Sequence, residues 1–118
     1  MPRDLKSFKD LINDGIIKTT GTLFTHHSGI LYYAKFESHN KIYPAVYKDG
    51  KLEYDKEIKF TSISKFAKAM ILKSNPQRKE AGGMDTCYYS DNEEYYDSIK
   101  LKEIRDAAYE EVVMESSL

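Results

Sequence analysis

The chain has 118 residues, of which 41% are hydrophobic, and this predicts a single globular domain with one core. Its formal net charge of -1 does not by itself suggest a nucleic-acid binder. The charges are unevenly distributed, however, so a local field can be strongly positive while the total is close to zero.

The first half of the chain predicts a short helix followed by an antiparallel meander. Asp4 can cap a helix that ends at Asn13-Asp14-Gly15, where Gly15 suits the left-handed position after the last turn. Apolar and aromatic residues then recur in short runs. The predicted strands cover residues 22–27, 30–37, 41–48, 51–55 and 57–60. Asp49-Gly50 is the strongest turn signal, because both central residues of a type I′ turn need positive φ, and Pro44 indicates an edge strand or a bulge.

The second half predicts a central helix, a polar loop, one more strand and a last helix. Ser62 is a good N-cap, and the residues after it repeat with the period of a helix that has one apolar face. The apolar face consists of Ile63, Phe66, Ala67, Met70 and Ile71. Pro76 breaks the loop and Gly82-Gly83 closes it. A strand is expected over residues 85–90. A helix is expected from about Ser98, with Leu101, Ile104, Ala108 and Val112 facing inward.

These elements together predict an α+β fold. The sheet should be small and antiparallel, with about four or five strands. An N-terminal helix, a central helix packed on the sheet and a C-terminal helix should accompany it. We expect a single domain over residues 4–113 and a frayed tail over residues 114–118.

The basic stretch around the central helix is the first candidate site. No acidic residue lies between Glu57 and Glu80, and the lysines of the helix should project away from the core. The candidate phosphate contacts are Lys65, Lys68, Lys73, Arg78 and Lys79. Asn75 and Gln77 carry amides suited to an adenine edge. The alternative is that these lysines are an ordinary solvated helix face and that Asn75-Pro76 is an ordinary helix stop.

The tyrosine pairs are a second candidate, since the chain has ten tyrosines and no tryptophan. In an extended segment one member of Tyr88-Tyr89 faces outward, and an exposed aromatic ring can stack on a base. The alternative is that both rings pack in the sheet.

Catalytic chemistry finds little support in the sequence. His26 and His27 are adjacent, so in a strand they point to opposite faces and cannot share a metal. Cys87 is the only cysteine, which excludes an internal disulfide framework and favours a reducing compartment, the cytosol or the nucleus. No Gly-rich phosphate loop is present. No apolar run reaches the roughly 20 residues of a membrane span, and the N-terminus lacks a signal-peptide core. We therefore expect no enzyme activity, cofactor, metal, small-molecule substrate or membrane partner.

The order of several short motifs resembles the RAMA domain, a module associated with restriction enzymes and adenine methylases. The resemblance covers about residues 8 to 106. The matching segments are Leu11-Ile12-x-x-Gly15-Ile16-Ile17-Lys18, Asp49-Gly50-Lys51-Leu52, Phe60-Thr61-Ser62-x-Ser64, Asn75-Pro76-x-Arg78-Lys79, Gly83 and Leu101-x-x-Ile104-Arg105. The loop segment is most similar to the animal type, which is found beside a metalloprotease-type domain.

This resemblance implies a non-enzymatic DNA- or chromatin-binding accessory module in the nucleus that reads adenine-methylated DNA. The family usually has a tryptophan after the glycine, and this chain has Met84 in its place. A thioether can fill the same space, but recognition of a modified base does not follow for this chain. The rival hypothesis is a protein-interaction module that recruits a partner in a chromatin- or ubiquitin-related complex through a sheet edge or a tyrosine-rich surface.

Overall fold

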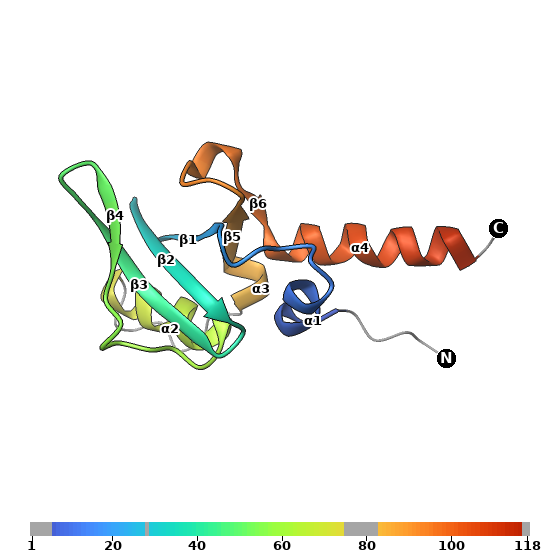
Figure 1. Ribbon diagram of the computed structural model, residues 1–118, viewed down its shortest axis with the longest axis horizontal. Coiled ribbons are helices and arrows are strands. Elements are labelled where there is room, and N and C mark those ends of the chain that lie inside the picture. The colour runs from blue at the N-terminus through green and yellow to red at the C-terminus, as the bar shows by residue number, and fades with distance from the viewer. Residues whose placement is uncertain (1–5, 28, 75–82, 117–118) are drawn as a thin grey trace.

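A computed structural model describes residues 6–27, 29–74 and 83–116 of the chain. This part folds into a single antiparallel sheet with helices at one face and one end (Figure 1). The elements in chain order are α1 (Phe8–Asn13), β1 (Thr22–His27), β2 (Ile30–Ser38), β3 (Lys41–Lys48), β4 (Lys51–Tyr54), α2 (Ile63–Ser74), α3 (Gly83–Thr86), β5 (Cys87–Ser90), η1 (Tyr95–Asp97), β6 (Ile99–Lys100) and α4 (Leu101–Ser116).

The sheet has six strands in the order β4-β3-β2-β1-β5-β6, and every neighbouring pair is antiparallel. β1 to β4 form the predicted meander. The type I′ turn is confirmed, because Asp49 and Gly50 have φ values of 52° and 79° between β3 and β4. Gly15 has a φ of 75° after α1, which confirms its left-handed position. The predicted bounds of β1 and β3 agree with the structure.

The hydrophobic core lies between α2 and one face of the sheet. Ser62 caps α2 as predicted, since its Oγ accepts a hydrogen bond from the Lys65 amide at 3.1 Å. The predicted apolar face of this helix is buried. It packs with sheet residues that share one face of the pleat, and α1 and α4 close the sides. The core residues outside α2 include Phe8, Leu11, Leu23, Ala34, Phe36, Ile42, Cys87, Tyr89, Leu101 and Ala108.

A second aromatic cluster covers part of the opposite face of the sheet. Phe24 on β1 is fully buried there, although its neighbour Leu23 points into the main core. The Phe24 ring lies 5.5 Å from that of Tyr33 and 5.7 Å from that of Tyr95 in η1. Tyr88 contacts Tyr95 at 5.5 Å. The 3-10 turn η1 therefore lies over this part of the sheet.

The α+β prediction is confirmed, but the expected sheet was one strand too small. β6 is only two residues long and pairs with β5 through Tyr88–Lys100 and Tyr89–Ile99. Such a short strand has no alternating pattern in the sequence. The strand expected over residues 57–60 is reduced to a single bridge between Ile42 and Phe60.

The helix starts also differ from the predictions. Asp4 lies outside the described residues, and Ser7 is the N-cap of α1 through a capping box with Asp10. Residues 85 and 86, which were expected to begin a strand, belong to α3, and β5 begins at Cys87. α4 starts at Leu101 and not near Ser98, because the Ser98 amide donates to the Tyr95 carbonyl and closes η1. The helix continues to Ser116, past the expected end of the domain at residue 113. None of the described helices combines the length and apolar character that a membrane span requires.

Candidate nucleic-acid interface

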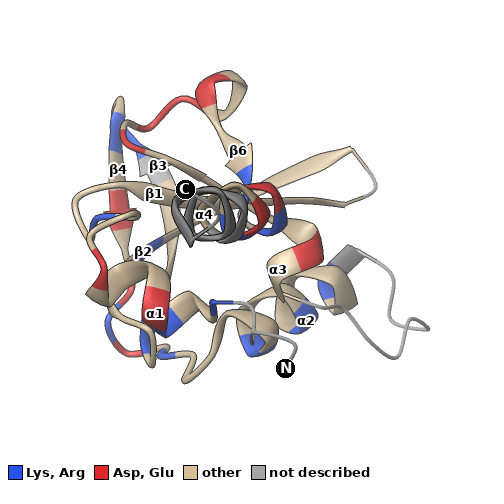
Figure 2. Ribbon diagram, turned by 90° about the vertical axis from the view of Figure 1, so that its right-hand side faces the viewer, with Lys and Arg blue, Asp and Glu red and all other residues tan. Residues whose placement is uncertain are grey.

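The outer face of α2 carries exposed lysines that no carboxylate neutralises within the described residues. Lys65, Lys68 and Lys73 are all exposed, and the helix has no acidic residue. The ammonium group of Lys65 donates to Thr61 Oγ1 at 3.0 Å. Five other basic side chains, by contrast, form ion pairs: Lys6, Lys35, Lys56, Lys102 and Arg105. Figure 2 shows blue segments on α2 and red segments around the turn that precedes β6.

The three lysines do not form one compact patch. At about 100° per residue, Lys65 and Lys68 project within about 60° of each other, but Lys73 lies about 140° from Lys68 around the helix axis. Lys73 instead lines an open pocket of about 410 Å³ together with Val46 and Ile58. The described part of the predicted patch is therefore the pair Lys65 and Lys68, with Lys73 on the side of the β3–β4 hairpin.

A groove at the N-terminal end of α2 adds residues that the sequence did not indicate. It has a volume of about 360 Å³ and apolar walls from Phe8, Ile63 and Met84. Its polar lining comes from α1, from the β2–β3 turn and from the residues before α2. These polar residues are Ser7, Lys9, His39, Thr61 and Ser62. Because Lys65 bonds to Thr61, the Lys65–Lys68 pair adjoins this groove.

Lys9 and His39 are brought to α2 only by the tertiary fold. They lie 52 and 22 residues before Thr61 in the sequence, and nothing in their local pattern indicates the contact. The four predicted contacts in the loop, Asn75, Gln77, Arg78 and Lys79, lie outside the described residues. Among the described residues, the candidate interface thus consists of the α2 lysine face (Lys65 and Lys68) and the groove beside it.

The structure brings neither Tyr88 nor Tyr89 to the α2 lysine face. Tyr89 is only 6% exposed and packs in the core, so little of its ring is accessible to a base. Its hydroxyl accepts from the Lys18 amide at 2.9 Å and donates to Asp91 Oδ1 at 2.6 Å. Burial raises the pKa of Tyr89 to about 12, and the bond to Asp91 acts in the same direction.

Tyr88 is half-buried on the opposite face of the sheet. Its ring packs against Tyr95, and the ammonium group of Lys100 lies 5.7 Å from its centre. A base stacked on Tyr88 would therefore be on the other side of the sheet from Lys65. The alternation of a strand correctly predicts that Tyr88 and Tyr89 face opposite sides of the sheet. It does not predict which of the two faces the core, because that depends on the residues packed against each face.

The pKa of the Cys87 thiol is raised, whereas activation of a cysteine as a nucleophile requires a lowered pKa. Its side chain is fully buried, and burial raises the pKa of the thiol to about 12. Catalytic cysteines need a lowered pKa, because the thiolate is the nucleophile. His26 and His27 occupy successive positions of β1, so they point to opposite faces. Within the described ranges, no three His, Cys, Asp or Glu side chains are grouped so as to hold a metal ion.

The sequence was also compared with known proteins. No protein-family model matches it, and no curated protein matches it.

Proposed function

We propose that this chain is a non-enzymatic DNA-binding module of chromatin that holds phosphates with the α2 lysine face. The observation that supports the proposal is the pair Lys65 and Lys68, exposed on an acid-free helix, free of ion pairs to described residues and adjoining a groove lined by Lys9 and His39. Ammonium groups in this arrangement supply affinity through release of counterions from DNA and do not read its sequence.

The groove supplies a place for a base beside these phosphate contacts. Phe8, Ile63 and Met84 give it apolar walls, and the hydroxyls of Ser7 and Thr61 with the His39 ring give it polar groups. We further propose that the module prefers DNA with methylated adenine, as the resemblance to the RAMA domain implies. A nuclear location follows from the same proposal.

Binding of a short DNA duplex, followed by fluorescence anisotropy across a salt series, tests the phosphate contacts. We expect the double variant Lys65→Ala/Lys68→Ala to bind more weakly and to flatten the dependence of log K on log salt by about 1.8, because each lost contact contributes about 0.9. The control is Lys51→Ala/Lys102→Ala, which changes the net charge equally on β4 and α4. An unchanged slope in the α2 variant would refute the assignment.

Two further arms use the same assay. Charge reversal at Arg78 and Lys79 tests the predicted loop contacts, and it should weaken binding further. Duplexes with and without N6-methyladenine test modified-base recognition. A preference that is lost in Met84→Ala, while binding of the plain duplex is retained, would support a role for the groove.

A specific observation also favours the rival, a protein-interaction module. Val46 is 56% exposed and Ile58 is 48% exposed, and with Pro44 they line the open pocket between the β3–β4 hairpin and Lys73. Exposed apolar side chains that share one hollow are typical of partner surfaces. Partner binding that tolerates high salt and persists in Lys65→Ala/Lys68→Ala would favour this function.

A further inference from the structure

An open pocket of about 420 Å³ lies on the face of the sheet opposite α2. Lys35 pairs with Tyr43 and Ala45 pairs with Tyr54, so these side chains share one face. Phe36 and Ile42, the neighbours of Lys35 and Tyr43 along their strands, point into the core beneath α2. Thr19, Thr20 and Glu37 complete the rim. We refer to the part formed by Glu37, Tyr43 and Tyr54 as the tyrosine pocket.

The tyrosine pocket has the chemistry of a cation site. The rings of Tyr43 and Tyr54 pack on each other, with centroids 5.8 Å apart and planes inclined by 32°. Tyr43 is only 7% exposed, so the accessible ring surface is that of Tyr54, which is 42% exposed. Ring faces carry negative charge density that attracts ammonium groups. The Glu37 carboxylate adds a full negative charge and an acceptor for an N–H bond.

One of the chain's own ammonium groups contacts two of the residues that line the pocket. Lys56 Nζ lies 5.4 Å from the centre of the Tyr54 ring and 3.3 Å from Glu37 Oε1. The hydrogen bond to Glu37, followed by the interaction with Tyr54, raises the pKa of Lys56. Because Lys56 and Glu37 are both well exposed, this ion pair is weak and a competing cation can displace it.

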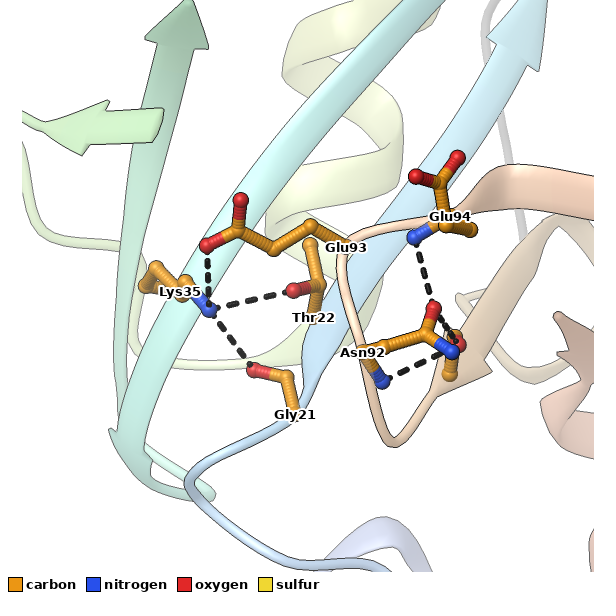
Figure 3. Close-up of polar contacts among 7 residues, drawn as sticks. Gly21, Thr22, Lys35, Asn92, Glu93 and Glu94 are labelled. Carbon is orange, nitrogen blue, oxygen red and sulfur yellow. Dashed lines mark hydrogen bonds and ion pairs between the residues drawn. The ribbon is translucent and has the colours of Figure 1, made fainter. Parts of the chain in front are cut away.

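Lys35 does not neutralise the site. Its ammonium group is directed towards β1, where it donates to Thr22 Oγ1 at 3.1 Å and to the Gly21 carbonyl at 3.4 Å (Figure 3). Glu93, in the turn before η1, pairs with it at 3.8 Å. Its charge is therefore balanced by groups at the far side of the pocket from Tyr54.

We infer that the tyrosine pocket binds a lysine side chain of a partner peptide and holds the dimethylated form best, with Lys56 as the intramolecular competitor. Methyl groups increase contact with the exposed Tyr54 ring and weaken hydration of the cation. A dimethylammonium group still keeps one N–H for Glu37, which a trimethylammonium group lacks. The pocket volume lies in the range of small-ligand sites and accommodates the end of one side chain.

A titration followed by amide chemical shifts of the full chain tests this. The probes are blocked Gly-Gly-Lys-Gly-Gly peptides with dimethylated lysine, with unmodified lysine and with norleucine, and tetramethylammonium chloride alone, all at one ionic strength. We expect shifts at residues 37, 43 and 54, with the dimethylated peptide tightest and the norleucine peptide silent. Tetramethylammonium alone should cause weaker shifts at the same residues, because it lacks both the N–H for Glu37 and the peptide contacts. Equal binding of the norleucine peptide, or shifts elsewhere than at residues 37, 43 and 54, would overturn the inference.

Three variants sharpen the test. Lys56→Ala removes the competitor and should tighten binding, whereas Lys102→Ala removes an ion-paired lysine at the α4 end and should not. Glu37→Gln and Tyr54→Leu should each weaken binding by about twofold to fivefold, the factor that one exposed cation–π contact or ion pair corresponds to. Both sites are exposed, so folding should persist. Unchanged or weaker binding in Lys56→Ala contradicts the inference.

Binding of the lysine peptide does not depend on the proposed DNA binding. The tyrosine pocket lies across the sheet from Lys65 and Lys68, so the α2 double variant should leave peptide binding intact. Loss of peptide binding in that variant would contradict the assignment to this face.

Discussion

Replacing Gly83 with alanine is expected to lower the free energy of unfolding by about 1–3 kcal/mol, the usual cost of overpacking a closely packed site. A Cβ atom there would lie 2.6 Å from the Ser64 amide nitrogen and 2.7 Å from the Ile63 carbonyl carbon. Both are backbone atoms in the first turn of α2, so they cannot rotate away. The Gly83 amide also donates to Ser64 Oγ at 3.2 Å, which fixes α3 against α2.

Urea unfolding monitored by circular dichroism measures this effect. The matched control is Gly50→Asn, because Gly50 has a φ of +79° with open space around its α-carbon, and asparagine tolerates that conformation. We expect the control to change stability little. Gly83→Ala should also disturb the groove, since Ile63 and Met84 line it. Wild-type stability in Gly83→Ala would show that α3 can move away from α2 at no cost.

Short sequence patterns correctly predicted the β1–β4 meander and the helix α2. Asp49-Gly50 specified a turn through its conformational preference, and the alternation on either side specified strands. Ser62 and the apolar period after it specified α2. Each of these depends on interactions within a few residues, which a single sequence reveals.

Features that depend on distant partners were not predicted. Tyr89 is buried because it packs in the core beside Leu23 of β1, and its hydroxyl bonds to Lys18, 71 residues earlier in the chain. Lys9 and His39 join the groove for the same reason. The contacts of Lys56 with Tyr54 and Glu37, on which the proposed cation site rests, also come from the tertiary fold.

The two proposed sites use opposite faces of one sheet, and this has a functional consequence. DNA held by α2 does not cover the tyrosine pocket, so one copy of the domain can contact both ligands. Glu93 of the turn before η1 pairs with Lys35 on the face of the sheet opposite α2. The net charge of -1 therefore coexists with a helix, α2, that has no acidic residue.

The chain should lose stability above pH 9 through Cys87, by about 1.4 kcal/mol per pH unit for this group. Burial raises the pKa of the folded thiol from an ordinary value of 9.0 to about 12. The unfolded chain therefore releases this proton at a lower pH than the folded chain. The contribution is fully present below pH 9 and is lost as the pH rises towards 12.

Comparison of wild type with Cys87→Ala between pH 7 and pH 10.5 isolates this effect. Tyr89, whose pKa is also raised to about 12, ionises in both proteins, so its effect cancels in the difference. The lost sulfur gives a constant offset, and the two stability curves should converge above pH 9. Parallel curves would show that the folded thiol ionises normally. That result would reopen a catalytic role for Cys87, whereas convergence means that the thiol stays protonated at neutral pH and cannot act as a nucleophile.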